Sequence, residues 1–357
     1  MISEFVFIDK TLAYALKNEK IDLPDYMLLM KKITAMTKMY FDIHINFLRK
    51  YSGGNSLNMD FGSIRAWVDC QEEQVLAAYE MGISWIKINI NNAVSDNAVN
   101  ELMKVLTLAA GFKMKITLGC MDITENIEEF QNEKLLNILN SFKISGLIVH
   151  DGESRLDPIS TYMKLLEIKK AVPVKLEYGG KNGLGLATGN TLGAVKSGIG
   201  TMSVSIGGIG GFPAYEEVAM GISRLLKIPV DIPRNIAVCC KELLEYIRIE
   251  IPKTKPIIGA NIFAHESGIH VDGIYKRSEL YEPFAPEEVG LSRKIVIGKH
   301  SGKAAIEHKI QELNINVKPY CIKTLLEKVR SLAIKQKTAV GDEQLLRLIE
   351  EVAVCNG

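Results

Sequence analysis

The chain has 357 residues, of which 47% are hydrophobic and 24% charged, so it can bury a large core and is not an intrinsically disordered chain. A formal net charge of +1, with no long run of lysine or arginine, argues against a nucleic-acid-binding protein. The first residues do not resemble a signal peptide, and no apolar run approaches the roughly 20 residues of a membrane helix, so we expect a cytoplasmic protein. The six cysteines form no C-x-x-C pair and indicate reduced thiols rather than a zinc site.

Eight short segments rich in β-branched and aromatic residues recur along the first 206 residues and are predicted to be strands. They are Phe5–Asp9, Phe41–Ile45, Ile64–Val68, Trp85–Ile90, Lys113–Leu118, Gly146–His150, Val174–Tyr178 and Met202–Ile206. Segments with helical periodicity separate several of them, such as Glu72–Met81, Val99–Ala110 and Pro158–Ala171. Strands that alternate with helices indicate parallel β/α units, and eight units favour a closed (β/α)8 TIM barrel. A doubly wound open sheet is the alternative, although no G-x-G-x-x-G follows the first strand.

Further helices are predicted at Ala214–Leu226 and Arg234–Arg248, followed by a proline-containing break. We therefore expect a barrel over residues 1–255, a linker or lid segment over 256–293, and a small helical C-terminal subdomain over 294–357. The last subdomain should hold two or three amphipathic helices after Gly302, ending with Asp342–Val352.

Chemistry in this fold lies at the carboxyl ends of the strands, where polar residues can be read from the sequence. Asp42 and His44 share one face of the second strand, whereas Asp69 and Asp122 are expected to cap helices or bind loop amides. The glycine-rich run at 207–211, after the eighth strand, is compatible with phosphate binding or with close loop packing. No His and carboxylate spacing at these ends predicts a divalent metal site.

Four of the six histidines lie beyond residue 260, in or near a polar segment, which favours a functional role for that segment. The pair His265 and His270 is one residue too far apart for H-E-x-x-H, and the run from Gly298 to Lys303 is too short for a P-loop, so both motifs are rejected.

The segment from Gly259 to Gly302 contains H-E-S-G-I-H-V-D-G-I, Y-E-P-F-x-P-E-E-V-G and R-K-I-V-I-G-K-H-S-G. These strings resemble the post-barrel region of the homocitrate synthase and α-isopropylmalate synthase family. In the barrel, L-G-L-A-T-G-N-T-L at 184–192 and Leu156-Asp-Pro158 resemble the same family. The large C-terminal regulatory domain of leucine-pathway members has no counterpart in this sequence, which favours the homocitrate branch of the nitrogen-fixation type. Members condense acetyl-CoA with a 2-oxo acid that is chelated by a divalent metal.

The barrel departs from the family pattern at the positions that bear the chemistry. The family's first strand ends D-x-T-L-R-D-G-E, and only Asp9 matches a metal-ligand position, because Ala13, Tyr14 and Leu16 replace the catalytic Arg, the Asp and the Glu. The two histidines of H-x-H-N-D after strand seven correspond to Gly179 and Lys181, and its Asp corresponds to Gly183. The Arg and Thr of the strand-six motif appear as Ile148 and Gly152, although Asp151 fits. The resemblance thus implies that this chain binds no metal by itself.

The post-barrel segment, in contrast, keeps the family's residues. In the family it acts in trans, covering the partner's barrel with a His and a Tyr. The matching candidate residues are His270 and Tyr281, with His265, Glu266 and Ser267 nearby. The chain therefore resembles the omega-type subunit of split clostridial homocitrate synthases. The hypothesis is that it completes the active site of a homologous catalytic subunit, which has an intact metal site and uses acetyl-CoA and 2-oxoglutarate.

Two alternatives remain open. One is a non-catalytic regulatory or scaffold pseudoenzyme. The other is a repurposed barrel that acts on a phosphorylated small molecule through Asp9, Lys181, Asp151 and the glycine-rich run.

Overall fold

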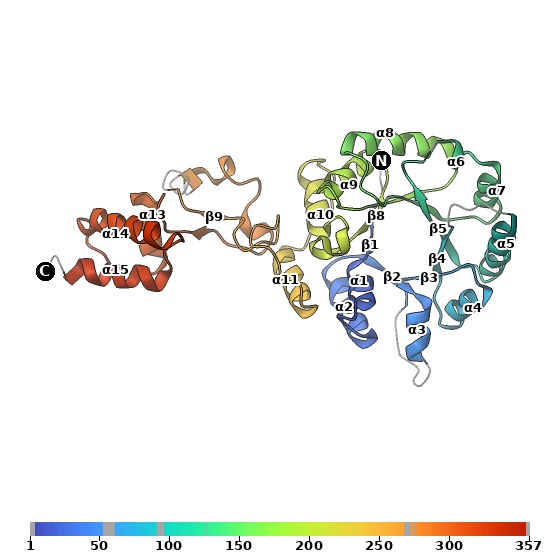
Figure 1. The fold of residues 1–357 in the computed structure, drawn as a ribbon, viewed down its shortest axis with the longest axis horizontal. Helices are drawn as coiled ribbons and strands as arrows, with labels where there is room; N and C mark the ends of the chain where they lie inside the picture. The colour runs from blue at the N-terminus through green and yellow to red at the C-terminus, as the bar shows by residue number, and fades with distance from the viewer. Residues whose placement is uncertain are drawn as a thin grey trace. The chain divides into compact units, whose positions relative to one another are not determined.

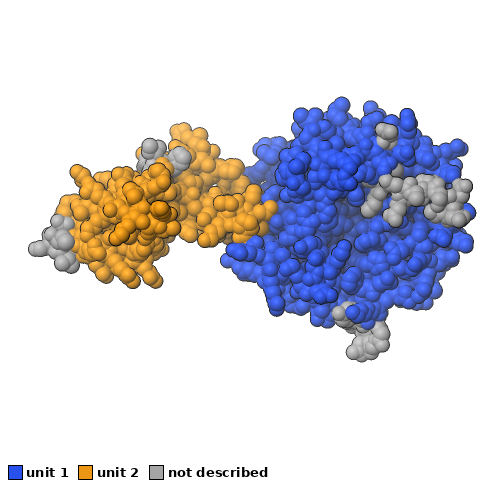
Figure 2. All heavy atoms as spheres, viewed as in Figure 1, with its two compact units in different colours: residues 1–233, 240–250 blue, residues 234–239, 251–357 orange. Residues whose placement is uncertain are grey.

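The computed structural model describes residues 4–52, 61–90, 96–125, 127–267, 273–274 and 276–354. These residues divide into two compact units, shown in different colours in Figure 2. Unit 1 comprises Met1–Pro233 with Cys240–Glu250, and unit 2 comprises Arg234–Cys239 with Ile251–Gly357. The predicted lid segment and the C-terminal helices both fall in unit 2.

Unit 1 is a closed barrel of eight parallel strands surrounded by helices (Figure 1). The strands are β1 (Val6–Asp9), β2 (Met39–His44), β3 (Ile64–Val68), β4 (Trp85–Asn89), β5 (Lys115–Asp122), β6 (Gly146–Asp151), β7 (Leu176–Gly180) and β8 (Thr201–Val204). The barrel closes where β1 pairs with β8, for example Phe7 beside Met202. The predicted barrel is confirmed, and the doubly wound alternative is wrong because that sheet would leave β1 and β8 unpaired.

The helices of unit 1 follow the strands in the order expected for β/α units (Figure 1). They are α1 (Thr11–Lys17), α2 (Leu23–Met36), α3 (Ile45–Ser52), α4 (Glu72–Glu80), α5 (Asp96–Gly111), α6 (Ile127–Phe130), α7 (Glu133–Ser141), α8 (Pro158–Ala171), α9 (Ala187–Lys196) and α10 (Tyr215–Arg224), with a 3-10 helix η1 (Ile206–Gly211) after β8. The residues of α11 (Ile236–Tyr246) are divided between the two units. Asp157 starts α8 by accepting hydrogen bonds from the amides of Ile159 and Ser160, and Pro158 favours the first helical turn.

Unit 2 combines short extended segments with a three-helix cluster. Its elements are β9 (Ala264–His265), η2 (Ser278–Leu280), η3 (Pro286–Glu288), β10 (Lys294–Ile295), α13 (Lys303–Glu312), α14 (Cys321–Gln336) and α15 (Asp342–Val354). The three helices confirm the helical prediction beyond Gly302, and they bury a common apolar core that includes Ile306, Leu325 and Leu345. Within the described ranges, no helix combines the length and apolar character needed to cross a membrane.

Candidate functional site

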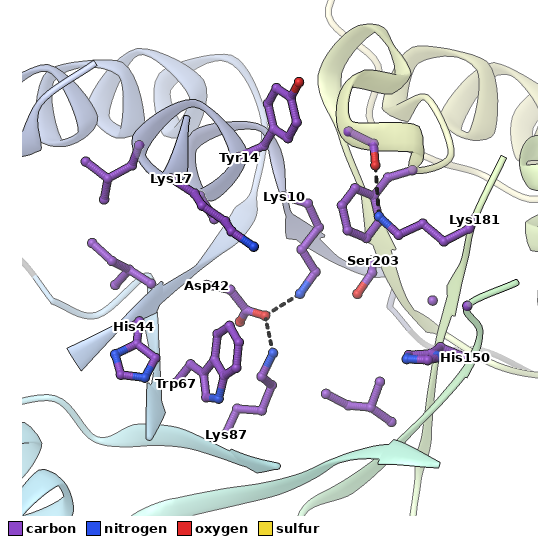
Figure 3. A pocket seen from close by; sticks show the side chains of 18 of the residues that line it. Lys10, Tyr14, Lys17, Asp42, His44, Trp67, Lys87, His150, Lys181 and Ser203 are labelled. Carbon is purple, nitrogen blue, oxygen red and sulfur yellow. Dashed lines mark hydrogen bonds and ion pairs between the residues drawn. The ribbon is translucent and has the colours of Figure 1, made fainter. Parts of the chain in front are cut away.

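A pocket of about 380 Å³ occupies the mouth of the barrel, at the carboxyl ends of its strands (Figure 3). Polar side chains on six strands or just after them line it: Lys10 after β1, Asp42 and His44 on β2, Lys87 on β4, His150 on β6, Lys181 after β7 and Ser203 on β8. Lys17 lines it from α1, and Trp67, Phe47 and Phe212 supply aromatic surface. The expectation that Asp42 and His44 face the mouth together is therefore confirmed.

A buried ion-pair network lies at the base of this pocket. Arg65 of β3 is fully buried and donates through Nε to Asp42 Oδ1 at 2.6 Å and through Nη2 to Glu177 Oε1 at 3.0 Å. The Ser203 hydroxyl donates to the same Glu177 oxygen at 3.0 Å. Fixed partners on both sides of the guanidinium satisfy its hydrogen-bonding fork, which is the condition for burying such charges.

Asp42 is shared by three cations. Besides Arg65, it accepts from Lys10 and lies 3.3 Å from the Lys87 ammonium (Figure 3). Burial by itself would raise the pKa of Asp42, but the charges of Arg65, Lys10 and Lys87 outweigh it and hold the pKa well below its usual range. Asp42 is therefore an anion whose charge is already used by protein cations.

Lys181 stands where the resemblance places a metal-binding histidine. Its ammonium donates to the Gly210 carbonyl oxygen at 2.8 Å and lies 3.4 Å from the centre of the Phe212 ring. Burial lowers the pKa of Lys181, and the nearby charges of Lys10 and Lys17 lower it further. The cluster of ammonium groups therefore disfavours further positive charge.

Asp9, the one residue that matches a family metal ligand, is 1% exposed and is absent from the pocket lining. Its Oδ2 accepts from the Leu12 amide at 2.9 Å, and its Oδ1 is buried with no hydrogen-bond partner among the residues that the structure describes. Burial raises the pKa of Asp9 to about 6. Among the described residues, no three His, Cys, Asp or Glu side chains gather as a ligand set. With Gly179 and Lys181 at the histidine positions, these residues do not fit the divalent metal that the family implies.

The glycine-rich run at 207–211 packs closely within the barrel end. The amides of Ile206, Gly207 and Gly208 already donate to Thr11 Oγ1, Glu216 Oε2 and the Ser205 carbonyl. A Cβ at Gly207 would lie 2.7 Å from Leu244 Cδ1. These contacts favour close loop packing over the phosphate cradle that the sequence also allowed.

Among the other strand-end carboxylates, Asp122 and Asp151 bind loop amides, whereas Asp69 contacts side chains of β2 and α4. Asp122 accepts from the Thr124 amide at 2.7 Å, as expected for a loop-binding residue. Asp69 instead contacts His44 at 3.3 Å and Gln74 Nε2 at 3.1 Å, while Gln71 occupies the N-cap of α4, so helix capping by Asp69 is wrong. Asp151 accepts from the amides of Arg155 and Leu156 and shapes the loop before α8.

The predicted lid residues all belong to the sequence range of unit 2. Of these, His270 lies outside the described residues. His265 Nε2 on β9 is 3.7 Å from Oε1 of the buried Glu282. Oε2 of Glu282 also pairs with Nη2 of Arg293 at 2.7 Å. Glu266 accepts from the His300 amide at 2.9 Å, and a Cβ at Gly298 would lie 2.5 Å from its carboxylate. His265 and Glu266 thus take part in contacts that organise their own unit.

Tyr281 and Ser267 complete the predicted set. Tyr281 is 41% exposed, and its ring packs so closely against Gly273 that a side chain there would not fit. Ser267 is half-buried. The structure thus brings His265 together with Glu282, and Glu266 together with the 298–301 turn.

Sequence reasoning missed Arg65, Glu177 and Lys87 as a network. The signal was a charged residue within each of three largely apolar strands, because a buried charge requires a partner inside the barrel. Their separation along the chain hid the pairing, because Arg65 and Glu177 are 112 positions apart.

Comparisons with known proteins agree with this architecture. Residues 56–239 match the family model described as HMGL-like, and residues 257–337 match the model described as homocitrate synthase post-HMGL domain-like. A 2-isopropylmalate synthase of Caldanaerobacter subterraneus is 34% identical over 310 residues, which cover 82% of this chain and 79% of that protein. The chain belongs to the homocitrate synthase and 2-isopropylmalate synthase family.

Other members of the family show similar levels of identity. Homocitrate synthase AksA of Methanopyrus kandleri is 31% identical over 300 residues, covering 83% of this chain and 75% of that protein. Homocitrate synthase 1 of a Nostoc species is 37% identical over 205 residues, covering 55% of this chain and 53% of that protein. The family resemblance inferred from the sequence motifs is therefore confirmed.

Solved structures share the fold at low identity. The HMG-CoA lyase of Bacillus subtilis superposes with a TM-score of 0.57 at 16% identity, covering 70% of this chain and 96% of that chain. The HMG-CoA lyase of Brucella melitensis gives 0.53 at 14% identity, covering 68% and 97%. These similarities concern the fold alone.

Proposed function

We propose that this chain is a subunit of a heteromeric homocitrate synthase that condenses acetyl-CoA with 2-oxoglutarate in the cytoplasm. A homologous partner chain with an intact metal site would provide the catalytic barrel, and the product would serve nitrogenase cofactor biosynthesis. The membership of the family supports the reaction class, and the relatives named homocitrate synthase support the choice of 2-oxo acid.

The observation that carries the proposal is the contrast between the two units. At the barrel mouth, Gly179 and Lys181 stand at the histidine positions, Ala13 stands at the catalytic arginine position, and Asp9 is not among the residues that line the pocket. A metal that polarises a carbonyl contributes several kcal/mol, and a positioned acid or base about 10²- to 10⁴-fold. A barrel without these groups is not expected to catalyse the family reaction by itself. The post-barrel region, however, matches its family model over residues 257–337.

In this proposal, unit 2 supplies the lid in trans. His270 and Tyr281 would face the partner's substrate, where an imidazole can move a proton and a phenol can donate to a developing oxyanion. Tyr281 has the exposure that such a role requires. His265, Glu266 and Ser267 would position the lid, as the contacts of His265 with Glu282 and of Glu266 with the 298–301 turn support.

The test is reconstitution. The chain would be purified alone, and together with a homologue that carries intact D-x-T-L-R-D-G-E and H-x-H motifs, and acetyl-CoA-dependent release of free CoA would be measured with 2-oxoglutarate. We expect turnover only from the mixture. His270→Ala should lower kcat by about 10²-fold or more without changing co-purification, and Tyr281→Phe should lower it less. His308→Ala, a histidine on α13 that is not assigned to the lid, is the matched control.

Turnover with stoichiometric metal in the chain alone would overturn the proposal. A His270→Ala complex as active as the wild type would refute the lid role and favour the regulatory or scaffold alternative.

A further inference from the structure

The barrel mouth has a charge pattern that the proposed lid function does not use. Four lysines line the pocket, from four separate elements: Lys10 after β1, Lys17 at the end of α1, Lys87 on β4 and Lys181 after β7. Figure 3 shows their side chains converging on one space. In the described part of the chain, Asp42 is the carboxylate that lines this pocket, and it is already shared by Lys10, Lys87 and Arg65. The four pocket lysines therefore carry more positive charge than the Asp42 carboxylate neutralises.

The excess charge is not relieved inside the protein at Lys181. Its ammonium donates to a carbonyl oxygen and lies over an aromatic ring, and neither contact carries a full negative charge. Burial and the charges of Lys10 and Lys17 lower the pKa of Lys181, so its charged form is disfavoured at this mouth and an anion bound there would stabilise it. Buried or half-buried cations at one mouth, close to a functional cleft, are typical of a binding site for negative charge.

We propose that this barrel mouth binds a small organic anion with two or more carboxylate groups, without a metal, through Lys10, Lys87 and Lys181, with Lys17 at the rim. The site replaces metal chelation by direct ammonium–carboxylate contacts. The proposal concerns this chain alone and is independent of the existence of a catalytic partner.

Three features favour an organic polycarboxylate over inorganic phosphate. The lysines come from four separate elements around the mouth, so a ligand with more than one carboxylate group can contact several of them. The volume of about 380 Å³ is in the range of small-molecule sites, and Trp67, Phe47 and Phe212 offer surface for carbon atoms. In addition, the amides of Ile206, Gly207 and Gly208 in the loop where many barrels bind phosphate already have acceptors.

The experiment is calorimetric titration of the full chain in low-salt buffer with EDTA, using citrate, glutarate and inorganic phosphate as separate probes. We expect saturable binding of citrate and of glutarate, weaker binding of phosphate, and loss of affinity as salt is raised. Lys181→Met should weaken citrate binding about tenfold or more, because it removes one charge-assisted contact while keeping an aliphatic stem beside Phe212.

Two exposed lysines, one at the pocket and one away from it, provide a control in which the substitutions do not disturb the buried core. Lys17→Met, at the rim of the pocket, should weaken citrate binding several-fold, whereas Lys196→Met, exposed at the end of α9, should leave it unchanged. Absence of saturable carboxylate binding, equal binding by the wild type and both pocket variants, phosphate binding as tight as citrate, or a requirement for added Mg²⁺ or Mn²⁺ would each overturn the proposal. None of these results bears on whether the lid acts in trans.

Discussion

Removal of the guanidinium at the base of the barrel mouth tests how the charged interior is held together. The change is Arg65→Met, which keeps much of the side-chain volume and removes the charge. Asp42 would retain Lys10 and Lys87, but Glu177, which is 2% exposed, would retain only its contact with the Ser203 hydroxyl among the partners described here. Breaking a buried ion pair by removing one partner costs about 3–5 kcal/mol, so we expect Arg65→Met to lower the free energy of unfolding by that amount at pH 7.

The loss should depend on pH in a defined direction. Burial would raise the pKa of Glu177, but in the wild type the Arg65 charge outweighs burial and lowers it. The wild-type pair therefore stabilises the fold above the pKa of an unfolded glutamate and loses this contribution as the pH falls through the folded pKa. In Arg65→Met, the charge that contributes most to lowering the pKa of Glu177 is gone, so Glu177 takes up a proton more readily. The difference in the free energy of unfolding between the wild type and Arg65→Met should thus become smaller as the pH falls from 7 to 5.

The assay is urea unfolding followed by tryptophan fluorescence. The chain has two tryptophans, Trp67 and Trp85, both in unit 1, and the Arg65 guanidinium lies 5.2 Å from the Trp85 ring. The signal therefore follows the barrel whatever unit 2 does. Arg65→Met/Glu177→Gln should recover much of the loss, and Arg49→Met, which breaks an exposed pair with Glu73, should cost less than about 1 kcal/mol. A cost for Arg65→Met no larger than that of Arg49→Met, or one that is constant with pH, would refute this reasoning.

Two further substitutions test other parts of the barrel. Burial raises the pKa of Asp9 to about 6, so the folded state retains a proton that the unfolded chain releases near pH 4. The protonated Asp9 therefore makes its full contribution to stability below about pH 4, and this contribution is lost as the pH rises through 6. Asp9→Asn should remove this loss and raise stability at pH 7.5 by about 1–3 kcal/mol; parallel pH profiles of urea midpoints would contradict it. Gly207→Ala should destabilise the barrel by more than Gly211→Ala, because both have positive φ but only Gly207 faces a side chain, Leu244 Cδ1, at 2.7 Å from the new Cβ; equal thermal midpoints would refute the packing argument.

The sequence was sufficient to predict the barrel because its strands are compact apolar runs separated by amphipathic segments. The predicted and observed bounds of β3, Ile64–Val68, coincide, and those of β7 differ by two residues at each end. The prediction for β5 ended at Leu118, whereas the strand continues to Asp122. The register shift between Leu118 and Met121 explains the difference, because an irregular strand breaks the alternation on which the prediction rests.

The site was predictable only in part. The pocket position of Asp42 and His44 follows from strand alternation and the fold class, which are local properties. The sharing of Asp42 by Lys10, Lys87 and Arg65 depends on the closure of the barrel, which brings residues from different strands to one level. Lys10 falls at the x of the D-x-T-L-R-D-G-E pattern, which specifies no residue type, and its contact with Asp42 spans 32 positions along the chain. Which charged residues form pairs is thus determined by how the strands align in the closed barrel, and not by residue type alone.

The charge pattern at the barrel mouth also limits how a metal site could be introduced into this barrel. Returning histidines to positions 179 and 181 would restore two side chains but not a metal site, because Asp9 accepts from the Leu12 amide outside the pocket lining and Asp42 is held by Lys10. Lys10 and Lys87 would still repel a divalent cation at the mouth. A metal site in this barrel would therefore require changes to the histidine positions, the carboxylates and the lysines together.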